Sequence, residues 1–228
     1  MPKIVDHDER RREVMSAARR VIVRDGIDAA TTRAIAKEAG YSNGVLAHYF
    51  ADKDEILLSA LRQSHERIRA RLTAKVESAP TALAALRELL LDNLPLDADR
   101  AQETRLEVSF WSRSLAAERL AEVQRAEAGE LRAAVRELLG RAREAGELRG
   151  RGRPTGETPG DAREAGETRE GPGTVGEPRG DGDLEDLDDL AEELLALVDG
   201  LSLHLLLYPD RLSRERARRI MLAAVERL

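Results

Sequence analysis

The sequence predicts an all-α protein of about nine helices, with a three-helix head at the N-terminus and a larger helical body after it. Apolar residues recur at spacings of three and four along most of the 228 residues, which is the period of helices buried on one side. Glycine or proline stands at the ends of several of these stretches, as at Gly26, Gly40, Pro80, Pro95 and Pro209. The length suits one large domain or two smaller ones.

The first predicted helix covers Asp8 to Arg24, where apolar residues repeat at helical spacing and Asp25-Gly26 marks the end. Three arginines, Arg10 to Arg12, open this helix. Positive charge at a helix N-terminus opposes the helix dipole. The run therefore indicates either a bound external anion or a group of charges that is simply solvated.

The stretch from Thr31 to Lys53 predicts two short helices joined by a tight turn. Gly40 suits the end of the first helix, because glycine adopts a positive φ at little cost. Ser42 suits the cap of the second helix, Asn43 to Phe50, where its hydroxyl can accept a free backbone N–H. Two short helices at this spacing form the helix-turn-helix arrangement, whose second helix enters the DNA major groove.

Asp52 and Glu55 form a capping box, which predicts the start of the next helix. Lys53 then lies at a helix N-terminus, where the dipole and the ammonium group can share a phosphate. On the second short helix, the inward side is expected to carry Val45, Leu46 and Phe50, and the outward side Asn43, His48 and Tyr49.

This stretch resembles the DNA-binding domain of the tetracycline-repressor (TetR) family, whose pattern is roughly T-x-R-x-I-A-x-x-A-G-V-S-x-G-x-L-Y-x-Y-F-x-x-K. Two positions depart from the pattern: Tyr41 replaces a small aliphatic residue, and Ala47 replaces a tyrosine. The Ala47-His48 pair is nearer the choline-sensing repressors of betaine biosynthesis, as is the opening MPK followed by three arginines. The residues in register with the family pattern are Thr31, Arg33, Ile35, Ala36, Ala39, Gly40, Ser42, Gly44, Leu46, Tyr49, Phe50 and Lys53.

The resemblance implies a ligand-responsive DNA-binding regulator of transcription, a repressor that a small molecule releases from its operator. It implies a homodimer on palindromic double-stranded DNA, with half-sites about 34 Å apart or a near multiple of that distance. Asn43 and His48 would read base edges with help from Arg33. Phosphates would be held by Thr32, Ser42, Tyr49 and Lys53. The complete set of expected DNA-binding residues is Thr32, Arg33, Ser42, Asn43, Gly44, Val45, His48, Tyr49 and Lys53.

Residues 1–53 are thus expected to form the helix-turn-helix DNA-binding domain, and residues 54–228 a helical regulatory and dimerisation domain. The body helices predicted from apolar spacing are Glu55 to Ala74, one that starts at Pro80, Ala101 to Ser114, Leu115 to Leu148, Leu184 to Leu207 and Ser213 to Leu228. The resemblance implies that the first of these links the head to a ligand pocket.

The candidate pocket residues are His65, Phe110 and Trp111. A lone histidine at the edge of a core is also open to a structural role. Choline-like cations are usually held in aromatic cages, and the body offers few rings with which to build one. These are Phe110, Trp111 and Tyr208. The sequence therefore leaves the ligand unidentified.

The last two predicted helices carry more apolar surface than one subunit can cover. The segment LLALVDGLSLHLLL is apolar nearly all round, and the final helix has a clean apolar stripe. The resemblance implies a four-helix dimer bundle, with Leu201, Leu205, Ile220 and Val225 at the interface. The alternative is that both helices complete the core of the monomer.

A low-complexity insert interrupts the body at residues 149–183. It has no Ile, Leu, Met or aromatic residue, and ten glycines and four prolines fall within it. Such a segment cannot bury enough apolar area to offset its chain entropy, so we expect it to be disordered. A tail that binds a partner is the alternative.

Composition excludes several classes of protein. Cysteine is absent, which excludes disulfides, thiol catalysis and cysteine zinc sites. Neither a signal peptide nor an apolar run of membrane-spanning length is found, so the cytoplasm is the expected location, with no membrane partner. The net charge of −6 argues against a general polyanion binder. Residues 1–53, however, hold ten Lys/Arg against eight Asp/Glu, so the basic groups must be focused on one face.

No catalytic motif is found, and the four histidines are scattered along the chain. We therefore expect no enzymatic activity, no cofactor and no metal site. The competing hypothesis from another class is an all-helical binding or scaffold protein that does not bind DNA, which a mobility-shift assay on the protein's own upstream region would separate from a regulator.

Overall fold

The computed structural model describes residues 7–148 and 181–228, and in that part of the chain it holds nine helices and no strand. The predicted all-α class and helix number are thus confirmed. In the second range, side chains are described from Asp186 onward. The helices are α1 (His7–Asp25), α2 (Thr32–Ala39), α3 (Asn43–Tyr49), α4 (Lys53–Ser78), α5 (Ala82–Asp92), α6 (Ala98–Ser114), α7 (Glu118–Glu144), α8 (Asp181–Leu207) and α9 (Arg214–Val225).

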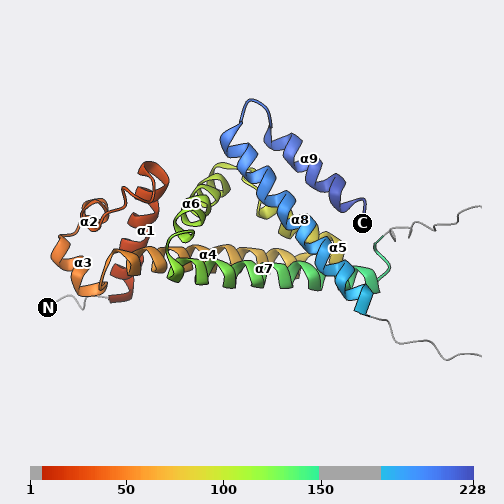
Figure 1. Ribbon diagram of the computed structural model, residues 1–228, viewed down its shortest axis with the longest axis horizontal. Helices are drawn as coiled ribbons and strands as arrows, with labels where there is room; N and C mark the ends of the chain where they lie inside the picture. The colour runs from red at the N-terminus through yellow and green to blue at the C-terminus, as the bar shows by residue number, and fades with distance from the viewer. Residues whose placement is uncertain (1–6, 149–180) are drawn as a thin grey trace, which may run out of the picture.

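Two long helices run between the ends of an elongated molecule (Figure 1). The head of α1, α2 and α3 lies at one end, and α8 and α9 lie toward the other, with α4 and α7 side by side between them. With 26 residues, α4 spans about 39 Å at the helical rise of 1.5 Å per residue. The head and the body are thus joined by one continuous helix.

The structure differs from the sequence prediction at several helix ends, including the starts of α7 and α8. The predicted helix from Leu115 begins instead at Glu118, after a turn that leaves Leu115 92% exposed. The next helix, α8, begins at Asp181 and not at Leu184, so residues 181–183 of the expected insert are helical. The rest of that insert, residues 149–180, lies outside the described residues.

Buried apolar residues form two cores, one in the head and one in the body. The head core holds side chains from α1, α2 and α3, and continues along the first half of α4 as far as Leu61. It also takes in Leu106 and Phe110 from α6 and Leu120 from α7. The packing of the head therefore extends beyond residue 53, into helices of the body. The body core joins α5, α7, α8 and α9.

Among the helices that the structure describes, none is long and apolar enough to cross a membrane.

Candidate functional site

The turn between α2 and α3 is held by side-chain and backbone caps. The Thr31 hydroxyl accepts the N–H of Ala34 at 3.1 Å, and the Ser42 hydroxyl accepts that of Val45 at 3.3 Å. Gly40 closes α2 with φ at 75°, in the left-handed region that glycine tolerates. The first helix therefore ends at Gly40 as predicted, and α3 begins at Asn43 as predicted but ends at Tyr49, one residue before the predicted end.

The second helix, α3, has one buried side and one side open to solvent. Leu46 is buried beneath it and Phe50 at its end, while Asn43, Gly44 and His48 are exposed. Of the other predicted DNA-binding residues, Arg33 and Ser42 are exposed, and Thr32, Val45, Tyr49 and Lys53 are half-buried. None of the nine predicted residues is fully buried, so each keeps some surface open to solvent.

Arg11 fixes the position of α3, a role that the sequence did not reveal. Its guanidinium group donates to the backbone carbonyl of Tyr49 and to Glu55, the latter at 3.3 Å. It also lies over the ring of Phe50, 4.3 Å from the centroid. One of the three arginines that open α1 therefore has an internal anionic partner, and an external anion is not needed to explain it.

The ring of His48 belongs to a small cluster at the outer face of the head. Its centroid lies 5.9 Å from that of His7 and 5.3 Å from that of Tyr49. The His7 and Tyr49 rings are 5.2 Å apart. These contacts join the start of α1 to α3, so the exposed His48 is held by its neighbours on one side.

The helix α2 is clamped to α1 by ion pairs. Arg20 and Arg24 both donate to Glu38, at 2.7 and 2.9 Å. The Tyr41 hydroxyl, at the position that departs from the TetR pattern, donates to Glu13, and its ring lies 5.7 Å from the Arg10 guanidinium. The head is therefore a preorganised unit in which α2 and α3 are both tied to α1.

Lys53 is tied to the turn that precedes α2. Its ammonium group donates to the carbonyl of Ile27 at 3.3 Å. An ammonium group has three donors, so this contact leaves Lys53 able to bind a phosphate as well. The side chain links the start of α4 to the helix-turn-helix motif.

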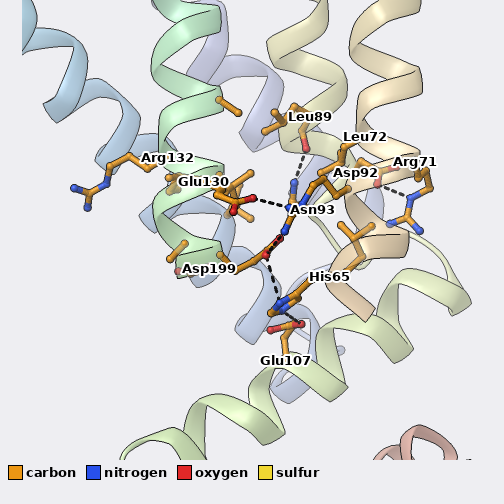
Figure 2. Close-up of a pocket in the computed structure, with 18 of the residues that line it drawn as sticks. His65, Arg71, Leu72, Leu89, Asp92, Asn93, Glu107, Glu130, Arg132 and Asp199 are labelled. Atoms are coloured by element: carbon orange, nitrogen blue, oxygen red, sulfur yellow. Dashed lines mark hydrogen bonds and ion pairs between the residues drawn. The ribbon is translucent and has the colours of Figure 1, made fainter. Parts of the chain in front are cut away.

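The body contains a cavity of about 930 Å³, lined by residues of five helices from α4 to α8. His65 and Trp111, two of the three candidate pocket residues, line it. Phe110 does not: it is fully buried in the head core, because adjacent residues on α6 point to different sides of the helix. Figure 2 shows His65, Asp92, Glu107 and Asp199 around this space.

His65 joins three helices at the floor of the cavity. It is 5% exposed, and its Nε2 lies 2.8 Å from a carboxylate oxygen of Glu107 on α6. Its Nδ1 lies 3.5 Å from Glu127 on α7. Burial lowers the pKa of His65, but the hydrogen bond and the charges of the two glutamates outweigh it, and the net pKa is raised.

Asp92 is the buried centre of an ion-pair network beside the cavity. Its side chain is fully buried and accepts from Arg71 at 2.7 Å, from Lys75 at 2.8 Å and from Arg100 at 3.2 Å. Burial raises the pKa of Asp92, but the three cations outweigh it and lower the pKa overall. Arg71 also forms a bidentate pair with Glu103, at 3.0 and 2.8 Å. The network joins α4, α5 and α6.

The residues predicted for the dimer interface divide into two groups. Val225 is 1% exposed and Leu201 is buried, so both pack inside the monomer and offer little surface to a partner. Leu205 is half-buried against the body core. Ile220 is 36% exposed on α9. The prediction of an interface on α8 and α9 therefore depends on the outer faces of these helices.

Two family models match the chain, one over the head and one over the body. Residues 14–60 match "Bacterial regulatory proteins, tetR family". Residues 82–160 and 174–228 match "BetI-type transcriptional repressor, C-terminal", which alone spans more than half of the chain.

Similar proteins are described as transcriptional regulators. The HTH-type transcriptional regulator PksA of Bacillus subtilis is 29% identical over 226 residues, which is 99% of this chain and 93% of PksA. BetI of Stenotrophomonas maltophilia is 32% identical over 127 residues, or 55% of this chain and 65% of BetI.

Solved structures share the fold. A transcriptional regulator from Rhodococcus sp. Rha1 superposes with a TM-score of 0.71 at 25% identity, over 94% of this chain and 93% of that one. A putative transcriptional regulator from Saccharomonospora viridis, in complex with choline, has a TM-score of 0.77 at 22% identity, over 96% of both chains.

Proposed function

The chain belongs to the TetR family of bacterial regulatory proteins, and we propose that it is a homodimeric repressor that leaves a palindromic operator when a small molecule enters the body pocket. The observation that carries this proposal is the exposed face of α3, with Asn43 and His48 uncovered on a helix that Arg11 and the caps of the turn hold in place. A protein that acts on chromosomal DNA in a bacterium works in the cytoplasm.

The roles of the head residues follow from their positions. Asn43 and His48 are exposed on the recognition helix, where side chains reach base edges in the major groove. Thr32 at the start of α2, Tyr49 at the end of α3 and Lys53 at the start of α4 would hold phosphates and fix the orientation of the helix. The Ser42 hydroxyl already caps α3, so its contact with DNA would add to a structural role.

The helix α6 provides a route from the pocket to the head. Leu106 and Phe110 pack in the head core, while their neighbours Glu107 and Trp111 line the pocket. Glu107 is also bonded to His65 on α4, the helix that leads into the head. A ligand that displaces α6 therefore moves part of the head core, and with it the position of α3.

Such a displacement releases DNA only if the ligand binds the released state more tightly than the DNA-bound state. Coupling of this kind typically changes affinity about 5- to 150-fold.

The outer face of α8 supports the dimer. Ala196, Gly200, Leu203 and Leu207 follow one another at spacings of four, three and four, which places them in one stripe along the helix. Two of these residues are small, and a Cβ atom built on Gly200 meets no other atom. Small residues in an exposed apolar stripe permit a second helix to approach closely. On the neighbouring α9, Ile220 is a further exposed apolar residue, and we propose that it belongs to the same interface.

The experiment that tests the proposal is selection of duplex DNA from a random pool by the purified full-length protein. A repressor of this design selects one palindromic sequence. Asn43→Ala relaxes the preference at one base pair of each half-site, at a cost of about 1–3 kcal/mol. Lys53→Ala weakens binding to all sequences alike and reduces the salt slope by about 1.

If the wild-type protein selects no sequence, the chain is a helical binding protein of another kind and the proposal fails. If Lys53→Ala changes the sequence preference and leaves the salt dependence untouched, the assigned roles of the two residues are wrong.

A further inference from the structure

Among the charged groups that line the pocket, carboxylates outnumber arginines. Nine carboxylates and six arginines line it. Each of the six arginines has a carboxylate partner among the described residues, which offsets its positive charge; these pairs are Arg69–Glu127, Arg71–Glu103, Arg100–Asp92, Arg125–Glu118, Arg132–Glu192 and Arg141–Glu137. The unsatisfied charge of the pocket is therefore negative.

Among the carboxylates that line the pocket, Asp199 on α8 is the one best placed to bind a cation. In the described part of the chain it has no hydrogen bond or ion pair, although it lines the pocket among apolar neighbours such as Leu195 and Val198. Asp199 is an exposed residue of α8, so its carboxylate lies at the rim of the pocket, open to solvent on one side. The surrounding protein still raises the pKa of its carboxyl group, because burial disfavours the charged form. An unpaired carboxylate at the rim of a cavity is available to a cation that enters it.

Ser202 supplies a second unsatisfied group on the same side of the helix. It follows Asp199 by three residues, so the two side chains lie on neighbouring parts of the α8 surface, and both line the pocket. Ser202 is 4% exposed, and its hydroxyl oxygen is buried with no hydrogen-bond partner. A buried hydroxyl without a partner is costly, so its presence in a cavity wall points to a ligand that bonds to it.

The other residues that line the pocket favour a protonated amine over a quaternary ammonium group. A quaternary ammonium group has no N–H donor and is recognised mainly by the faces of aromatic rings. Trp111 is the only Trp, Tyr or Phe among the described lining residues. A protonated amine, in contrast, can donate to the Asp199 carboxylate and to the Ser202 hydroxyl at the same time. The apolar part of the wall, with Leu72 and Leu131, would then take a hydrocarbon portion.

We infer that the pocket binds a primary or secondary ammonium ion with an apolar tail, held by Asp199 and Ser202, in preference to a quaternary ammonium or an anion. This inference rests on the proposed function only in treating the pocket as the effector site. It deepens that function by naming the chemical class of the effector.

The test uses three probes that share one hydrocarbon chain: octylammonium, octyltrimethylammonium and octanoate. Binding to the full-length dimer is measured by isothermal titration calorimetry, without DNA. Octylammonium binds at least about tenfold more tightly than octyltrimethylammonium, and octanoate does not bind. Asp199→Asn weakens octylammonium about 10- to 100-fold and removes its advantage over the trimethyl probe. Ser202→Ala weakens octylammonium and leaves the trimethyl probe unchanged.

Asp189→Asn is the matched control, because Asp189 is an exposed aspartate of the same helix that does not line the pocket. It leaves all three affinities unchanged, and circular dichroism verifies that each variant is folded. Equal or tighter binding of the trimethyl probe, binding of octanoate, binding of none of the probes, or an unaltered octylammonium affinity in Asp199→Asn would each overturn the inference. If octylammonium binds as expected but does not release operator DNA, the inference stands and the ligand-responsive function fails.

Discussion

Replacing Gly200 with arginine separates the proposed dimer from the fold of the monomer. Gly200 is exposed on α8, and nothing lies within 4 Å of a Cβ atom built there, so the monomer has room for a side chain. Glycine also costs a helix roughly 1 kcal/mol relative to good helix formers, so Gly200→Arg slightly stabilises the isolated subunit. In a dimer the same position lies between helices whose axes are about 8–10 Å apart, where a long charged side chain cannot be accommodated.

Gly129→Arg is the matched control, because Gly129 is also an exposed helical glycine with no atom within 4 Å of its Cβ position. It lies on α7, away from the outer face of α8. Sedimentation equilibrium should show a folded monomer for Gly200→Arg and a dimer for Gly129→Arg. Loss of the link between two half-sites should weaken operator binding of Gly200→Arg about 10²- to 10⁴-fold, while the control keeps its affinity. A Gly200→Arg dimer with unaltered operator affinity would refute the placement of the interface on this face of α8.

Further predictions concern the buried polar groups of the body and the anchor of the head. Because the pKa of His65 is raised in the folded protein, its contribution to stability is fully present below the unfolded pKa of about 6.5 and is lost as the pH rises through the folded pKa. His65→Gln should therefore reduce the free energy of unfolding more at about pH 5.5 than at about pH 9. Equal losses in urea unfolding at the two pH values would contradict the assigned contact with Glu107. Asp92→Asn leaves three half-buried cations without their shared, fully buried partner and should cost about 1–3 kcal/mol in the same assay; a loss below about 0.5 kcal/mol would mean that the network is solvated. Arg11→Met should leave α1 folded but loosen α3, which would appear as faster amide hydrogen exchange at Leu46, and unaltered exchange there would refute the anchoring role.

The helix-turn-helix was predictable from sequence because local chemistry determines it. The positive φ of Gly40 and the capping bonds of Thr31 and Ser42 depend on residues within one or two turns. The existence of the nine helices likewise follows from local apolar spacing. The turn before α7 was missed because it contains no glycine or proline, and its cap residue, Ala117, makes no side-chain bond.

The pocket could not be predicted in the same way, because it is assembled from residues far apart in the chain. His65 and Glu107 are 42 residues apart, and Arg71 and Asp92 are 21 apart. A carboxylate on an amphipathic helix has the same sequence context whether it faces solvent or a cavity, so the burial of Asp92 gave no local signal. Phe110 and Trp111 were grouped as aromatic neighbours, yet they lie on different sides of α6 and serve the head core and the pocket separately.

The dimer interface, too, could not be predicted from local sequence patterns. An apolar stripe shows that a helix face is covered, but not by what. Leu201 and Val225 proved to be covered by the subunit's own core, which leaves the outer stripe through Gly200 and the exposed Ile220 as the surface for a partner.

If two copies of the head read DNA as one symmetric unit, a hydroxyl-radical footprint on the selected operator should show it most directly. We expect two equivalent protected half-sites on one face of the duplex, with centres about 34 Å apart or a near multiple, and both should disappear together when the effector is added. A single asymmetric protected site, or protection spread evenly over any DNA sequence, would contradict it.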